Sequence, residues 1–176
     1  LRRYRQHPQV LYAEPDYMVK VVGTTPNDPS FPQLWGLHNT GQTGGTAGAD
    51  IHAPEAWDIT TGSSSVVVGV IDTGIDYTHS DLAANMFRNA VECTPNGIDD
   101  DHNGYIDDCY GIDTCNHDSD PIDDVFHGTH VAGTIGAVGN NNVGVVGVNW
   151  HVGLAACKFI GAEGYGYDSG AIECLD

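Results

Sequence analysis

The chain has 176 residues, 40% of them hydrophobic, which is enough for one globular core. Its formal charge of −18, from 24 acidic and 6 basic residues, argues against nucleic acid or an anionic membrane surface as a partner and favours cations. No apolar run approaches the ~18–20 residues that a membrane span needs.

The first segment differs from the rest in composition, because four of the six basic residues lie within the first 20 positions. This shift indicates a boundary in the twenties. Residues 7–19 alternate apolar and polar side chains after a proline turn, which predicts a strand. Residues 24–61 are punctuated by prolines and a glycine cluster, so we expect extended or looped chain there. Within them, residues 51–57 predict a short helix with Pro54 in its first turn.

The next feature is a short run of β-branched residues, 66–71, that ends at Asp72 and a glycine turn. Such a run predicts a buried parallel strand that presents Asp72 at its carboxyl end. Ligand-binding and catalytic groups of open α/β sheets gather at that edge.

Residues 92–124 form a strongly acidic insertion, with eleven acidic residues and no basic one. Oxygen-bearing side chains and a glycine follow the spacing of an EF-hand calcium loop, although Tyr110 replaces its closing glutamate. Calcium suits such a flexible loop better than magnesium, and the alternative is a solvated acidic loop. The expected ligands are Asp99, Asp101, Asn103 and the backbone carbonyl of Tyr105, with Asp107 or Asp108 closing the shell.

The cysteines favour disulfides over a zinc site, because the five of them lack both CxxC spacing and a paired histidine motif. Three of them bracket the acidic insertion, where a cross-link would constrain the unfolded chain. Their pairing stays open, and one must be free or paired outside the chain. They are Cys93, Cys109, Cys115, Cys157 and Cys174.

A histidine motif follows the insertion: His127-Gly128-Thr129-His130, then several small residues. This spacing predicts a helix that begins near His127 and packs closely on a neighbour, with a buried structural role for His130. Residues 152–160 predict a second buried strand, followed by a glycine-rich turn at 161–166 and a helix at 168–176. The alternation predicts an α/β fold with a doubly wound, mostly parallel sheet.

The Asp72-Thr73-Gly74 and His127-Gly128-Thr129-His130 segments resemble the motifs of subtilisin-like serine peptidases, the subtilase family. The resemblance implies that His127 takes the proton of a serine nucleophile and that Asp72 holds the imidazole. The family's serine lies in a Gly-Thr-Ser-Met-Ala type of motif, and nothing like it follows His127. We therefore expect a fragment that is truncated before the serine-bearing half and is inactive by itself.

The resemblance also implies a domain division. Residues 1–23 resemble the end of an inhibitory propeptide, which would act as an intramolecular inhibitor and be cleaved between Tyr17 and Thr25. The alternative is an ordinary first strand of the same domain. Residues 24–176 would be the N-terminal part of the catalytic domain, with the calcium-binding insertion at about 92–124.

Two further sites come from the resemblance alone. A second calcium site would use Asp81, a loop with Val143 and Val145, and Asp28, which otherwise reads as a turn residue. Asn141 is the expected side-chain ligand in that loop, although Asn140 and Asn142 stay open. The segment Gly164, Tyr165 and Gly166 resembles the edge that pairs with substrate backbone, and otherwise it is a plain surface turn.

The function expected from all this is a secreted, monomeric, calcium-dependent serine endopeptidase that acts on proteins or peptides. Calcium would be structural. The alternative is a catalytically inactive pseudopeptidase or a calcium-stabilised binding module, since the acidic insertion would fit either.

Overall fold

A computed structural model describes residues 7–12 and 23–175 of the chain. The strand expected at residues 7–19 and the propeptide boundary fall largely outside these residues. None of the helices in the described ranges is long and apolar enough to cross a membrane.

The centre of the fold is a three-stranded parallel sheet with the order β1-β3-β2. The strands are β1 (Gly62–Asp72), β2 (Gly111–Asp113) and β3 (His151–Lys158). In this register Lys158 pairs with Asp72 on one side and with Asp113 on the other. The three strands therefore end together, and their polar terminal side chains meet at one edge. This small parallel sheet with helices confirms the predicted α/β class.

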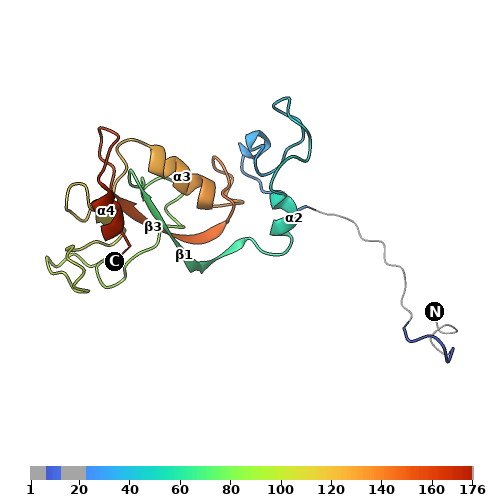
Figure 1. Cartoon of the computed structure of the whole chain (residues 1–176), viewed down its shortest axis with the longest axis horizontal. Helices are drawn as coiled ribbons and strands as arrows, with labels where there is room; N and C mark the ends of the chain where they lie inside the picture. Colours follow the sequence, from blue (N-terminus) through green and yellow to red (C-terminus); the bar gives the residue numbers. More distant parts are fainter. Residues whose placement is uncertain (1–6, 13–22, 176) are drawn as a thin grey trace.

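The helices are short, and α3 (His127–Gly136) packs against β1 and β3 (Figure 1). Its buried residues Gly128, Ala132 and Gly136 recur at intervals of four, so one face of small side chains lies against the sheet. The others are the 3-10 helix η1 (Phe31–Gln33), α2 (Ala53–Trp57) and α4 (Asp168–Glu173). The predicted helix at the histidine motif is confirmed.

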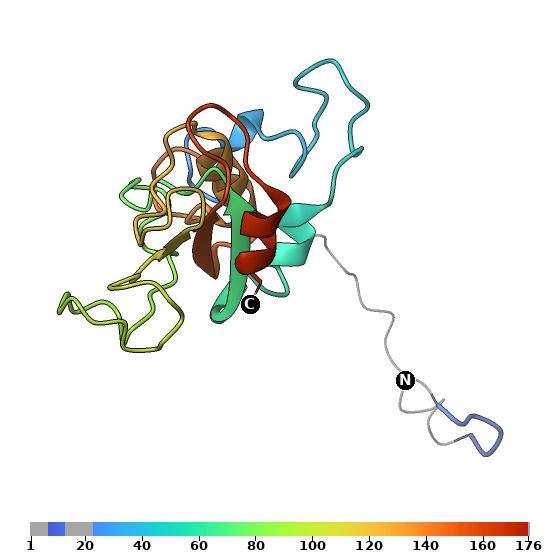
Figure 2. The ribbon, with the colours of Figure 1, turned by 60° about the vertical axis from the view of Figure 1, so that its left-hand side comes forward.

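Two hydrophobic clusters hold the fold together. The larger lies between α3 and the sheet and includes Val70, Ile75, Leu82 and Leu154. The smaller packs Trp57 edge-on against Trp150, with ring centroids 5.3 Å apart, and so attaches α2 to the sheet region. In Figures 1 and 2 the yellow-green acidic insertion projects from the end of the molecule opposite α2.

The prediction that residues 66–71 are buried is wrong for the first half of the run. Val66 and Val67 are 56% and 46% exposed, whereas Val70 is 3% exposed. β1 is an edge strand of the described sheet, and only the face that carries Val68 and Val70 packs on the core that α3 covers. Strand β2 lies within the acidic insertion and was not predicted from the sequence.

Candidate functional site

Asp72 lies at the carboxyl end of β1, as the sequence predicts. Its Oδ1 accepts a hydrogen bond from the backbone N–H of Thr73 at 2.7 Å. The chain then turns sharply at Gly74, which has a φ of 100° that side chains rarely adopt. The turn leaves the carboxylate at the edge of the sheet, with 14% of the side chain exposed.

His127 is the first residue of α3. The helix start comes very close to the Asp72 turn, because a Cβ at Gly128 would overlap the carbonyl oxygen of Gly74. The Gly128 N–H also donates to the Thr73 hydroxyl at 2.8 Å. Glycine is therefore required at the second position of the motif for the imidazole to reach the strand end.

The two side chains form one hydrogen-bonded pair: His127 Nδ1 lies 2.7 Å from Asp72 Oδ1. The hydrogen bond and the negative charge of Asp72 raise the pKa of His127. Because Nδ1 faces the carboxylate, it carries the proton, and Nε2 is the nitrogen left to accept one. The histidine side chain is 68% exposed, so a reacting group has access to the imidazole.

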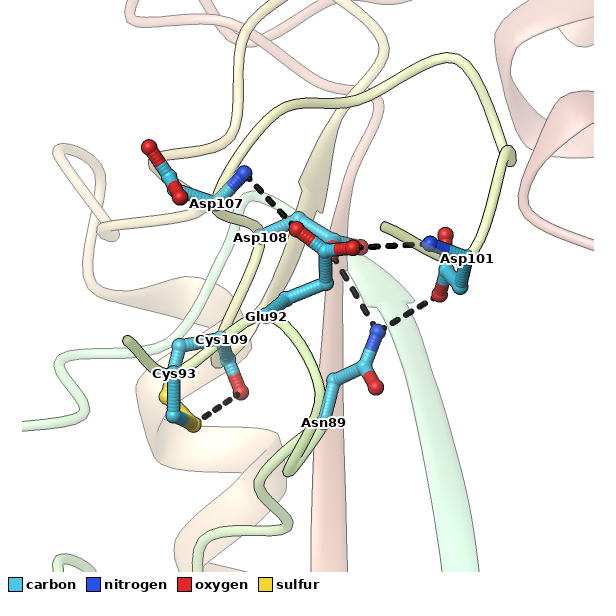
Figure 3. The surroundings of a disulfide bond; sticks show 7 residues. All are labelled: Asn89, Glu92, Cys93, Asp101, Asp107, Asp108 and Cys109. Atoms are coloured by element: carbon cyan, nitrogen blue, oxygen red, sulfur yellow. Dashed lines mark hydrogen bonds between the residues drawn. A yellow bond between two sulfur atoms is a disulfide. The ribbon is translucent and has the colours of Figure 1, made fainter. Parts of the chain in front are cut away.

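In the acidic insertion, the structure brings three carboxylates together: Glu92, Asp99 and Asp101 each place an oxygen within 4.8 Å of the others. Glu92 is 1% exposed, and its carboxylate accepts from the N–H groups of Asp100, Asp101 and Asp107 at 2.6, 2.9 and 3.0 Å. Figure 3 shows this carboxylate at the centre of the loop. Three carboxylates this close repel one another unless a cation neutralises them.

The remaining predicted ligands of the insertion have different surroundings. Asp108 is 4% exposed and accepts from Asn103 at 2.9 Å, and burial together with the charges of Asp101 and Glu92 raises its pKa. Asp107 accepts from the N–H groups of residues 96 and 97, so its carboxylate points away from Asp101 (Figure 3). Tyr105 is buried and donates its hydroxyl to Glu173 of α4 at 2.7 Å.

The residues of the second predicted cation site also lie together, around the loop at 140–145. Asp81 accepts from the Asn141 amide at 2.7 Å and from the Val145 N–H at 2.9 Å. Val143 donates to the Asn141 side-chain oxygen at 2.8 Å. Asp28 accepts from the N–H of residue 140 at 2.7 Å, while its other oxygen, Oδ1, is buried with no hydrogen-bond partner among the described residues.

The predicted substrate edge is a turn after β3. Gly161 donates to the Tyr165 carbonyl at 3.2 Å, and Tyr165 is 72% exposed. A Cβ at Gly166 would overlap the carbonyl oxygen of Phe159, so this position excludes a side chain. The backbone is therefore open at Gly164, whereas at Gly166 it packs closely against the backbone of Phe159.

The disulfide pairing, which the sequence left open, is Cys93 with Cys109 and Cys157 with Cys174. The free cysteine is Cys115, which is exposed.

The buried role expected for His130 is wrong, because this residue is exposed. It lies two residues from Gly128 along α3, and thus on the face opposite the buried one.

Two carboxylates were missed by reasoning from the sequence. Glu92 precedes the EF-hand-like segment in the sequence, but its carboxylate lies in the acidic cluster with Asp99 and Asp101. No local sequence pattern marks it. Asp123 lies four residues before His127 and accepts from Thr73 and Thr129 of the two motifs. Its closeness in sequence to the histidine motif was the one signal that could have indicated a role at the site.

Comparison with known proteins agrees with the motifs. The model of the subtilase family, Peptidase_S8, matches residues 63–175, well over half of the chain. Subtilisin-like protease 1 of Plasmodium berghei is 47% identical over 120 residues, covering 67% of this chain and 20% of that protein. Neuroendocrine convertase 2 of Homo sapiens is 34% identical over 134 residues, covering 76% of this chain and 19% of that protein. The chain spans about a fifth of the length of these relatives.

Solved structures show the same fold. A protease from Pseudoalteromonas arctica matches with a TM-score of 0.62 and 30% identity, over 86% of this chain and 43% of its own. The Aeromonas sobria serine protease, solved in complex with a chaperone, matches with a TM-score of 0.65 and 25% identity, over 85% of this chain and 23% of its own.

Proposed function

The chain belongs to the subtilase family, and on that premise we propose that the full-length protein is a secreted, calcium-dependent serine endopeptidase. It hydrolyses peptide bonds with a triad of Asp72, His127 and a serine outside these 176 residues. The single observation that carries the proposal is the 2.7 Å contact between His127 Nδ1 and Asp72 Oδ1.

In this mechanism Nε2 of His127 takes the proton of the serine hydroxyl as the serine attacks the scissile carbonyl, and later delivers it to the leaving amine. Asp72 holds the tautomer in which Nε2 is free and stabilises the imidazolium that forms. The raised pKa of His127 supports this role, because it reflects preferential stabilisation of the charged ring.

We propose calcium as the structural ion at two places. At the first, Glu92, Asp99 and Asp101 would supply carboxylate oxygens, with Asp108 as a further acidic neighbour. At the second, the buried and unpaired Oδ1 of Asp28 fits a cation, because a buried carboxylate oxygen without a partner is costly. Hard oxygen donors of this kind suit Ca²⁺.

We further propose that substrate adds a strand along residues 164–166, where the backbone is open at Gly164 and the exposed Tyr165 borders the bound peptide. Residues 1–23 would be the end of a propeptide that occupies this region before cleavage. The two disulfides support an exported protein, because such bonds persist in oxidising compartments.

The test is labelling of the full-length protein with a fluorophosphonate probe, which reacts with activated serines, alongside hydrolysis of a peptide library. We expect labelling and hydrolysis in the wild type, and loss of both in His127→Ala and Asp72→Ala. His127→Ala should also retain residues 1–23, whereas the wild type removes them. A folded wild-type protein that never labels would overturn the proposal in favour of a pseudopeptidase.

A further inference from the structure

The carboxylate of Asp123 lies between the two motifs and has both oxygens fully engaged. Oδ1 accepts from the Thr73 hydroxyl at 2.9 Å and from the N–H groups of Val125 and Phe126 at 2.9 and 2.8 Å. Oδ2 accepts from the N–H and hydroxyl of Thr129 at 2.8 and 2.5 Å. A carboxylate offers about four acceptor sites, so five donors saturate it and hold it in one orientation.

The Thr73 hydroxyl continues this network to the helix. It donates to Asp123 and accepts from the Gly128 N–H at 2.8 Å. Thr73, which follows Asp72, is therefore hydrogen-bonded to Gly128, which follows His127. This connection is separate from the contact between Asp72 and His127. The Thr129 hydroxyl makes a parallel connection, since it accepts from the Asp76 N–H at 2.9 Å.

The start of α3 needs such a support. Phe126, the residue before the helix, has a φ of 68°, and its side chain provides no hydrogen-bonded cap. The first N–H groups of a helix have no partner within the helix, and a negative charge near them is favourable. Asp123 supplies both the acceptor and the charge.

We propose that Asp123 is a positioning residue of the active site, whose carboxylate fastens the start of α3 to Thr73 and thereby holds His127 against Asp72. It touches neither the substrate nor the reacting atoms, and it acts through the histidine. The inference rests on the proposed function for its kinetic consequences, but its geometric part is independent of activity.

The charges around His127 support this role. Although burial opposes ionisation of Asp123, the hydrogen bonds from Thr129, Val125 and Thr73 lower its pKa, so it stays charged. Its charge adds to that of Asp72 in raising the pKa of His127. Lys158 and Asp124, which also lie at this edge, form an ion pair at 2.6 Å.

The test compares Asp123→Asn with Asp120→Asn in the full-length protein. Both remove one negative charge from the same loop, but Asp120 is exposed and accepts from the Tyr77 hydroxyl instead of from the motifs. The first readout is the NMR titration of His127, which needs no peptidase activity. We expect its pKa to fall in Asp123→Asn and to stay unchanged in Asp120→Asn.

The second readout is the pH profile of kcat/KM. A misplacement of about 1 Å at a catalytic group costs about 100-fold, so we expect Asp123→Asn to lower kcat by 10- to 100-fold with little change in KM. The acid limb should move to lower pH, because a histidine with a lower pKa becomes neutral earlier. Thr73→Val should lower kcat and shift the acid limb in the same direction but less, since the contact with Asp72 is weakened while the charge of Asp123 remains, and Thr73→Ser should restore both.

The proposal is overturned if Asp123→Asn leaves both the His127 titration and kcat at the values of Asp120→Asn. Loss of activity with an unshifted titration would also overturn it, because His127 would then still lie against Asp72 and the loss would have another cause. If the wild type proves inactive, the peptidase proposal fails. The NMR titration still tests whether Asp123 positions His127.

Discussion

Gly128 is the position where the two motifs approach most closely, and its replacement by alanine tests that packing directly. A Cβ there would overlap the carbonyl oxygen of Gly74 and lie 3.1 Å from the Cβ of Asp72. Neither atom can rotate away. The Gly74 turn is itself held from behind, because the N–H of Ile75 donates to the Pro121 carbonyl at 3.0 Å. The start of α3 must therefore shift outward.

Such overpacking typically costs about 1–3 kcal/mol, so we expect Gly128→Ala to lower the free energy of unfolding by that amount. Gly133→Ala is the matched control on the same helix, because no described atom apart from the adjoining residues and the backbone of its own helix lies within 4 Å of a Cβ built there. In a helix interior, alanine is favoured over glycine by up to about 1 kcal/mol. The two substitutions should therefore change stability in opposite directions.

The assay is urea unfolding of the chain monitored by circular dichroism. It compares the free energy of unfolding of the two variants with that of the wild type. In the full-length protein, Gly128→Ala should also lower kcat, since the displaced helix start carries His127 away from Asp72. If Gly128→Ala is as stable as Gly133→Ala, the close approach of the two motifs is refuted, along with the reasoning built on it.

Three further outcomes are expected. Calcium at about 100 times its dissociation constant should stabilise the chelator-treated protein by about 2.7 kcal/mol per site, and thermal melts should show a smaller gain in Asp28→Asn. The raised pKa of His127 should add stability that is fully present below the unfolded pKa of about 6.5 and is lost as the pH rises through the folded pKa. Urea titrations across this range should show a parallel loss in the wild type but not in Asp72→Asn. Replacing both Cys93 and Cys109, 16 residues apart, by serine should cost about 3 kcal/mol in the same titrations, and an unchanged midpoint would contradict this.

Features that depend on neighbouring residues could be predicted from the sequence. The β-branched run before Asp72 predicts a strand, and the small residues after His127 predict a helix with one close-packed face, because each pattern repeats over a few positions. The pairing of Asp72 with His127 was expected from the motifs together, and the structure places them 2.7 Å apart. The EF-hand-like spacing likewise predicted Asp99 and Asp101 as calcium ligands, because this spacing also involves only residues close together in the sequence.

Only the tertiary structure decided the features that depend on contacts across the chain. The exposure of Val67 follows from its place on the face of β1 opposite Val68 and Val70, and no local pattern encodes which face packs on the core. Glu92 enters the acidic cluster, and Asp123 reaches Thr73 across 50 positions, because the fold brings their backbones together. Sequence periodicity reports which face of an element is apolar, whereas the partner of a buried carboxylate is chosen by the packing of distant segments.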